Sequence, residues 1–406
     1  MIKKFFFPAV SVLALWLCTC ASLGSGGKVM EPKVSMYLRT WPIPEAMRID
    51  GSPNWNVDMI KGEYLTDIII AFALLEKDDV SVPYIPELKP VFGGEALFPN
   101  IWDEVAALKE KYPHLKVNIS AGGYAADGFS DMADDPALRA AFVANVCKWL
   151  EDYNLDGMDV DWEYPVGPEW DIGIKTRPAD KGNYITLLQD LRNAFDALGE
   201  KTGKRYGLST AVPASGWFPK ANDVRAAARI VDSLKLMSYD YYGGWSSTTG
   251  HNGNIYNNSF DPAWGGWSTD QALNEYLWAG VAPGKIVLGV PFYGKGWQGV
   301  KPGDNESTPG LYQPWTPPLP FDQGSVSWSQ IAEFLKPGSG YTRYWDDIGC
   351  APYIYNGDIW ISYCDGEQIK LLTAYVKEKG LGGVFVWEYG HDMNAELLKI
   401  LSENSQ

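Results

Sequence analysis

The chain has 406 residues and a formal net charge of −16 at pH 7, and it contains 18 Trp, 23 Tyr and 15 Phe. This length suits a single large α/β barrel that carries an insertion. So strong an acidic excess repels phosphate backbones, which excludes nucleic acid as a partner.

The N-terminal segment has the pattern of an export signal. Lys3 and Lys4 precede an apolar stretch at residues 5–17, which is too short to span a bilayer. We therefore expect residues 1–20 to be a signal peptide and the protein to be exported. Residues 17–22 read Leu-Cys-Thr-Cys-Ala-Ser and loosely resemble a bacterial lipobox. The sequence leaves two forms of the exported protein open. One is a free secreted protein, and the other is a cell-surface lipoprotein that is attached to the membrane only through a lipid on Cys20.

The remaining cysteines and the histidines argue against a disulfide scaffold and against a metal site. Cys147, Cys350 and Cys364 are an odd set, although Cys350 and Cys364 could pair in an exported protein. Histidines and cysteines form no cluster at ligand spacing, and no phosphate-binding loop or serine-hydrolase elbow is present. We expect neither a metal nor a cofactor.

Short apolar runs alternate with helical patterns along the chain, which is typical of repeated βα units. Eight strands are expected, at residues 33–40, 65–75, 116–120, 157–163, 206–212, 233–239, 285–291 and 382–387. Helices are expected at 136–153, 181–201, 269–278, 366–379 and 394–401, with Gly380 as a helix stop. This order predicts a (β/α)8 TIM barrel.

An insertion is expected between the seventh and eighth strands. That gap is too long, and too rich in Gly, Pro, Trp and Tyr, to be a simple crossover helix. We therefore predict a barrel formed by residues 33–297 and 362–402, with residues 298–361 as a small α+β domain.

The most informative segment is residues 155–164, Leu-Asp-Gly-Met-Asp-Val-Asp-Trp-Glu-Tyr. On a strand, Asp159, Asp161 and Glu163 share one face, and apolar side chains occupy the other. Three carboxyls buried together must hold protons, so at least one pKa is raised. Glu163 lies at the C-terminal end of the strand, where barrel enzymes keep their active sites, and is the natural proton donor. The alternatives are a solvated acidic edge, which the apolar alternation disfavours, and a hard-cation site.

The aromatic content favours a sugar ligand. The apolar face of a pyranose packs on an aromatic ring, while Tyr and Trp keep a polar tip for hydrogen bonds. For any single ring taken alone, a place in the core is the preferred interpretation.

At these residues the chain resembles glycoside hydrolase family 18, the chitinases. The family signature Asp-x-x-Asp-x-Asp-x-Glu is matched at Asp156, Asp159, Asp161 and Glu163. Two further family motifs occur in the same order along the chain as in the family, Ser-Ala-Gly-Gly at 120–123 and Met-Ser-Tyr-Asp at 237–240. The resemblance to the family also includes residues 249–252, 289–294 and 382–388. Residues 344–363 resemble the family's chitinase insertion domain, which favours a deep groove. The resemblance covers nearly all of the chain after the leader.

The resemblance implies a retaining hydrolase that cleaves β-1,4 linkages between N-acetylglucosamine units of chitin or chito-oligosaccharides. In this family the substrate's own N-acetyl oxygen attacks the anomeric carbon and forms an oxazolinium ion. By resemblance, Glu163 protonates the glycosidic oxygen and later activates water. Asp161 holds the acetamido N–H, with Asp159 sharing a proton behind it, and Tyr239 and Asp240 bind the acetamido group and the sugar.

The same resemblance implies a set of substrate-binding residues. Trp387 forms the floor beneath the distorted sugar ring. The other expected binding residues are Tyr37, Phe72, Gly123, Tyr124, Met237, Trp245 and Tyr293. Two positions depart from the common pattern, because Tyr124 stands where Trp is frequent and Lys295 where Arg is common. A lysine lacks the planar fork of an arginine, so we expect altered subsite preference with catalysis retained.

Two alternatives to a chitinase stay open. The first is an endoglycosidase that acts on other N-acetylglucosamine glycans, including a peptidoglycan-directed enzyme. The second is a chitin-binding lectin of the same fold. Such lectins typically lack the acid or an aspartate, whereas this chain has all three carboxyls. We expect a monomer and, without a separate carbohydrate-binding module, better activity on soluble oligomers than on crystalline chitin.

Overall fold

The computed structural model describes residues 32–44, 53–90, 94–168, 170, 172–263 and 267–405. The predicted signal peptide, with its two lysines and Cys20, lies outside the described residues. Residues 32–406 form one compact unit. Among the helices that the structure describes, none is long and apolar enough to cross a membrane.

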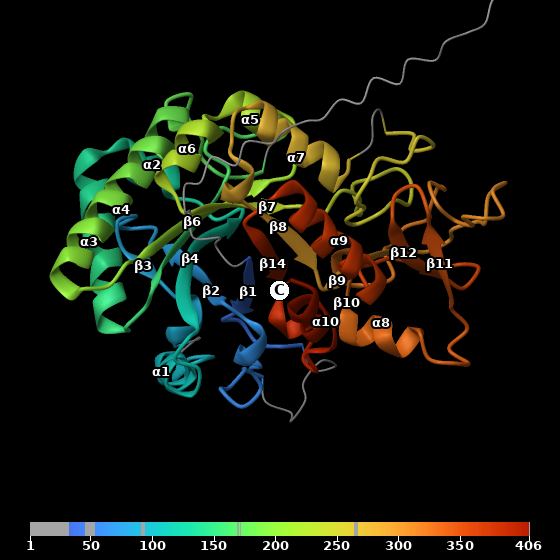
Figure 1. Ribbon diagram of the computed structural model, residues 1–406, viewed down its shortest axis with the longest axis horizontal. Helices are drawn as coiled ribbons and strands as arrows, with labels where there is room; N and C mark the ends of the chain where they lie inside the picture. Colours follow the sequence, from blue (N-terminus) through green and yellow to red (C-terminus); the bar gives the residue numbers. More distant parts are fainter. Residues whose placement is uncertain are drawn as a thin grey trace, which may run out of the picture. The chain divides into compact units, whose positions relative to one another are not determined.

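Eight parallel strands form a closed barrel, which confirms the predicted fold class (Figure 1). They are β1 (Lys33–Arg39), β2 (Asp67–Leu75), β4 (Lys116–Tyr124), β5 (Gly157–Glu163), β6 (Gly207–Pro213), β7 (Ser233–Met237), β8 (Ile286–Pro291) and β14 (Gly383–Trp387). Each strand pairs with the next, and β1 pairs with both β2 and β14, so the sheet has no open edge among these eight. A short strand, β3 (Pro83–Tyr84), lies antiparallel to β2.

Helices cover the outside of the barrel and explain why the acidic face of β5 points inward. The covering helices are α1 (Ile101–Lys111), α2 (Phe129–Asp134), α3 (Pro136–Asp152), α4 (Asp180–Thr202), α5 (Trp217–Ala221), α6 (Val224–Ile230), α7 (Thr269–Trp278), α9 (Gly366–Lys379) and α10 (Glu396–Ser405). Trp162 of β5 stacks on Phe129 of α2 at a ring-centroid distance of 5.4 Å and meets Tyr184 of α4 edge-on. Packing this apolar face outward leaves the three carboxyls on the interior face.

Helix ends follow their local sequence signals. Gly380 adopts the left-handed conformation (φ 64°) at the C-cap of α9, as expected for a helix stop. The last helix starts at Glu396 and runs to Ser405, so the predicted range 394–401 was displaced. Its first turn is capped by Asp392, whose carboxylate accepts from the backbone N–H groups of Glu396 and Leu398.

A second, antiparallel sheet stands beside the barrel and confirms the predicted insertion between the seventh and eighth strands (Figure 1, orange). It contains β9 (Tyr293–Trp297), β10 (Ser325–Ser327), β11 (Thr342–Asp346), β12 (Ala351–Tyr355) and β13 (Trp360–Ser362), with helix α8 (Trp328–Phe334). Strand β9 precedes residue 298, so this sheet draws on residues before the expected insertion. The expected domain boundaries remain a prediction.

Cys147, Cys350 and Cys364 are free thiols. The pairing between Cys350 and Cys364 that the sequence left open is therefore absent from the described residues.

Candidate active site

The interior of the barrel holds an aromatic cluster distinct from the main core. Tyr37 and Phe385 are buried there, and Phe72, Tyr239 and Trp387 pack against them. These residues come from β1, β14, β2, the end of β7 and the end of β14. Residues that are far apart in the sequence thus meet near the carboxyl ends of the strands, the end at which barrel enzymes bind substrate.

The acidic row of β5, formed by Asp159, Asp161 and Glu163, is buried along its whole length. The exposed fractions rise from 0% at Asp159 through 4% at Asp161 to 7% at Glu163. The row therefore runs from the sealed barrel interior toward the carboxyl end of the strand.

Asp159 is surrounded by hydrogen-bond donors. Its Oδ2 accepts from the Tyr37 hydroxyl at 2.7 Å and the Ser120 hydroxyl at 2.9 Å. Its Oδ1 accepts from Ser209 at 2.6 Å and from the Lys235 ammonium at 3.1 Å. Burial alone would raise the pKa of Asp159, but the charge of Lys235 and these hydrogen bonds hold it below its ordinary value. The proton that the resemblance expects Asp159 to share with its neighbour remains a prediction.

Asp161 has the opposite environment. Its Oδ1 is buried and makes no hydrogen bond with the part of the chain that the structure describes. Burial, followed by the charges of Glu163 and Asp159, raises the pKa of Asp161 well above its ordinary value. The surroundings of Asp161 thus favour its protonated form, whereas those of Asp159 favour the ionised form.

Glu163 is poised to exchange a proton near neutrality. Burial raises its pKa to about 7, with a smaller contribution from the charge of Asp240, while a hydrogen bond with Tyr164 acts in the opposite direction. A carboxyl that stays protonated close to neutral pH can serve as a general acid there.

Flat aromatic side chains cluster near this row, where the Tyr37 hydroxyl reaches Asp159. The Phe72 and Trp387 rings are stacked at 5.6 Å, and Trp41 stacks on Phe72 at 6.1 Å. Tyr37 lies 5.4 Å from Trp387. Gly123 is required at its position, since its φ is 101° and an added Cβ would lie 2.8 Å from the Phe72 ring.

Polar groups gather in the segment just after β7 and at the start of β9. The Tyr293 hydroxyl donates to Asp240 Oδ1 at 2.7 Å, and Tyr239 meets Tyr293 edge-on. Lys295 pairs with Asp240 at 3.2 Å and lies 5.6 Å from the Trp245 ring. Lys295, which stands where arginine is common in the family, thus still places a positive charge beside Asp240.

The other predicted site residues lie around this centre. Met237 packs in the interior aromatic cluster. Tyr124 and Trp245 are 68% and 66% exposed, so they lie at the surface rather than inside the barrel. Tyr124 is nevertheless in register with Glu163 on the neighbouring strand.

Several residues that organise the site were not predicted from the sequence. Lys235 is the clearest case, because strand alternation places it on the same face as Met237 and Tyr239, and a lysine on the inner face of an apolar strand is an unusual signal. Arg39 and Glu388 form a second missed pair, with Arg39 Nε 3.0 Å from Glu388 Oε1. Within the described ranges, no group of three or more His, Cys, Asp or Glu side chains could hold a metal ion.

Comparison with known proteins places this site in a family. The model for glycosyl hydrolases family 18 matches residues 33–392. Chitinase A1 of Niallia circulans is 37% identical over 326 residues, which cover 75% of this chain and 46% of that protein. Chitotriosidase-1 of Mus musculus is 30% identical over 367 residues, covering 87% of this chain and 72% of the relative. The match thus spans about half the length of the Niallia protein.

Solved structures agree with this placement. A family 18 N-acetylglucosaminidase from Paenibacillus barengoltzii superposes with a TM-score of 0.77 at 32% identity, covering 92% of this chain and 99% of that one. Chitinase ChiA74 from Bacillus thuringiensis superposes with a TM-score of 0.80 at 29% identity, covering 93% and 70%.

Proposed function

Because this chain belongs to the family 18 glycosyl hydrolases, we propose that it cleaves β-1,4 linkages between N-acetylglucosamine units of chitin or chito-oligosaccharides, with retention at the anomeric carbon. The observation that carries the proposal is the acidic row that ends at Glu163, whose pKa is raised to about 7. Its neighbours include a wall of stacked aromatic rings suited to a pyranose face.

Glu163 is the proposed general acid. It donates its proton to the glycosidic oxygen as the bond to the leaving sugar breaks, and the resulting carboxylate then takes a proton from the attacking water. The raised pKa supports this role because the carboxyl must be protonated before the first step and must regain its proton after the second.

The nucleophile in this proposal belongs to the substrate. The carbonyl oxygen of the N-acetyl group attacks the anomeric carbon and forms an oxazolinium ion, so no enzyme carboxylate bonds to the sugar. In its ionised form, Asp161 accepts a hydrogen bond from the acetamido N–H and offsets the positive charge that develops, so this role requires Asp161 to have released the proton that its burial favours. The Asp161 oxygen without a protein partner supports this assignment, because it leaves an acceptor available.

The surrounding side chains position the sugars. Trp387 and the stacked Phe72 supply the apolar floor, while Tyr239 and Asp240 bind the acetamido group and the sugar hydroxyls. The further binding residues in the proposal are Tyr37, Gly123, Tyr124, Met237, Trp245 and Tyr293. The exposure of Tyr124 and Trp245 supports contacts with outer sugars rather than with the reacting ring.

The direct test is Glu163→Gln, assayed on chitin oligosaccharides. We expect kcat/KM to fall by about 10²–10⁴-fold, because the amide cannot donate a proton as the carboxyl does, while calorimetry still detects oligosaccharide binding. Glu378→Gln is the matched control, since Glu378 is 71% exposed on α9. A Glu163→Gln protein that hydrolyses at the wild-type rate would remove the proposed role. Binding without cleavage by the wild type would favour a lectin.

A second assay separates the substrate-assisted mechanism from a two-carboxylate one. Oligomers of glucosamine without N-acetyl groups lack the internal nucleophile, so we expect the enzyme to leave them uncut while it cleaves acetylated oligomers of equal length. Equal rates on both would contradict the mechanism. Cleavage confined to branched N-linked glycans or to peptidoglycan would move the substrate class to another N-acetylglucosamine glycan.

We also propose that the chain is exported and acts as a monomer. The two lysines and the apolar stretch within residues 1–17 support a signal peptide. Cys20 supports a lipid anchor, and this form of export is the one to test first. Palmitate labelling of cells that produce the protein distinguishes the two forms, since a label that depends on Cys20 indicates a lipoprotein and its absence indicates free secretion. Light scattering of the purified protein reports the oligomeric state.

A further inference from the structure

Asp159, at the N-terminal end of the acidic row, pairs with the buried cation of Lys235. Lys235 lies on β7 with its side chain 6% exposed, and its Nζ is 3.1 Å from Asp159 Oδ1. The same ammonium also donates to the Ser209 hydroxyl, which in turn donates to Asp159. Among the residues that the structure describes, Asp159 is the one carboxylate within ion-pair distance of Lys235.

The four groups around Asp159 can all act as donors at once only toward an ionised carboxylate. Tyr37, Ser120 and Ser209 each offer one hydroxyl proton, and Lys235 offers ammonium protons. They come from four strands, β1, β4, β6 and β7, so the barrel closure itself brings them together. A proton on Asp159 would displace one of these bonds and leave a buried donor unpaired, which is costly.

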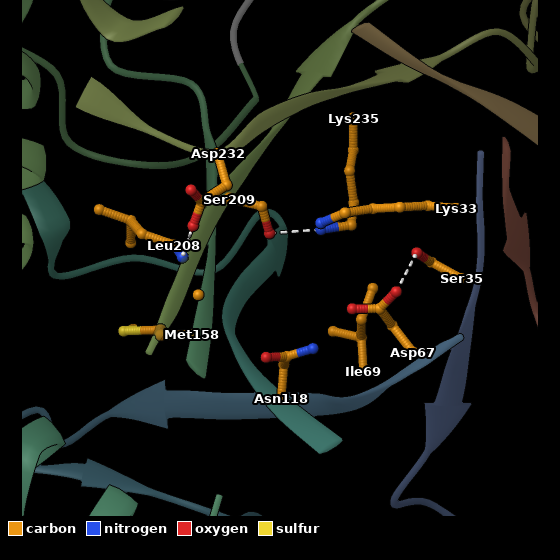
Figure 2. A pocket seen from close by; sticks show the side chains of 11 residues that line it. Lys33, Ser35, Asp67, Ile69, Asn118, Met158, Leu208, Ser209, Asp232 and Lys235 are labelled. Atoms are coloured by element: carbon orange, nitrogen blue, oxygen red, sulfur yellow. Dashed lines mark hydrogen bonds between the residues drawn. The ribbon is translucent and has the colours of Figure 1, made fainter. Parts of the chain in front are cut away.

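A small pocket at the N-terminal ends of the strands supports the charge of Lys235. Figure 2 shows Lys235 and Lys33 pointing into it from β7 and β1, with Asp67 and Asp232 on its walls. Asp67 accepts hydrogen bonds from the hydroxyls of Ser35 and Thr66, and Asp232 forms an ion pair with Arg205. The pocket has a volume of about 30 Å³, which admits water beneath the lysine.

The other titratable groups near Asp159 cannot substitute for this cation. The groups that face it or share its pocket are Tyr37 of β1, Asp161 of β5, Tyr184 of α4, Tyr239 after β7, and Lys33, Asp67 and Asp232 at the pocket. Of these only Lys33 carries a positive charge, and it makes no ion pair with the row within the described ranges.

We infer that Lys235 is a positioning residue of this site: its ammonium keeps Asp159 as a permanent anion and so confines the transferable proton of the acidic row to Asp161 and Glu163. The inference rests on the proposed function and deepens it. The proton that Glu163 donates is then not lost to Asp159, and within the row Asp161 is the carboxyl that can share it.

The first test is the pH profile of kcat/KM for Lys235→Met. Removing the cation makes Asp159 and Asp161 easier to protonate, so the acidic limb moves to higher pH, by about 1–3 units. The largest loss of activity then appears on the acidic side. Lys235→Arg keeps the charge and is expected to keep the limbs near their wild-type positions.

Lys33→Met is the matched control, because it removes the same charge from the same pocket without touching the row. Its limbs are expected to stay in place. A Lys235→Met enzyme with lowered activity but unmoved limbs would overturn the inference and leave the proposed function intact. An inactive wild-type protein would instead contradict the proposed function.

Infrared spectroscopy tests the same inference without activity and without a Lys235 variant. At about pH 5, above the pKa of an ordinary aspartate, the wild type should show the C=O band of a protonated Asp161, and difference spectra against Asp161→Asn should reveal its loss. Asp159 should stay ionised in Asp161→Asn, so the double variant Asp159→Asn/Asp161→Asn should lose no further band. A protonated band that is present in Asp161→Asn and absent from the double variant would show that Asp159 carries a proton and would overturn the inference.

Discussion

Asp159 and Glu388 are fully buried carboxylates, and each forms an ion pair with a buried cation. Lys235 pairs with Asp159, and Arg39 pairs with Glu388 through two guanidinium nitrogens. Glu388 directly follows Trp387, so the second pair anchors the backbone next to the proposed floor of the sugar site. Burial would raise the pKa of Glu388, but the charges of Arg39 and His391 and the hydrogen bonds from Arg39 and the Gly390 N–H hold it below its ordinary value.

Arg39→Met should therefore destabilise the fold strongly. It leaves Glu388 buried, with an exposed fraction of 0%, and without its cation, so we expect a loss of about 3–5 kcal/mol in the free energy of unfolding at pH 7. A carboxylate with a lowered pKa stabilises the fold above its unfolded pKa, and this contribution is lost as pH falls through the folded pKa. The difference between wild type and variant should thus shrink in acid, as urea unfolding at several pH values can show.

Lys148→Met is the control for that experiment. It removes one partner of an exposed pair with Asp152, whose side chains are 69% and 42% exposed, and should change stability by less than about 1 kcal/mol. Equal losses from both variants would contradict the special role of the buried pair.

At the scale of elements, α3 shows how a local signal sets a helix that the site needs. Asp135 is its N-cap and accepts from the N–H groups of Ala137 and Leu138, and Pro136 occupies the first turn. The helix packs on α2 and α4, which carry the rings that cover the apolar face of β5.

Asp135→Ala removes this cap and should cost about 1 kcal/mol of stability, whereas Asp135→Asn, which retains a side-chain acceptor, should cost less. Thermal unfolding followed by circular dichroism measures both. An alanine variant as stable as the wild type would show that packing alone fixes the start of α3.

Elements were predictable where periodicity and end signals agree. The eight strands, the capped helices and the stop at Gly380 follow from local patterns. Strand β4 was expected to end at residue 120 but continues to Tyr124, because Gly122 and Gly123, with φ of 120° and 101°, keep its pairing with β5. Such φ values are open to glycine but cannot be read from hydrophobic alternation.

At the scale of the whole molecule, the contacts that matter join residues far apart in the chain. Asp159 and Lys235 are separated by 76 positions, and Arg39 and Glu388 by 349. Strand alternation predicts which face each side chain occupies, but only barrel closure and register decide which of them meet. For that reason the acidic row was predictable from one strand, while the cation beneath it was not.

The measurement that tests the central claim most directly is the anomeric form of the first products from chitin oligosaccharides, followed by NMR at early times for wild type and Glu163→Gln. We predict β-anomers from the wild type before mutarotation and almost no product from the variant. α-Anomers from the wild type, or β-anomers at the same rate from both proteins, would contradict a retaining mechanism in which Glu163 supplies the proton.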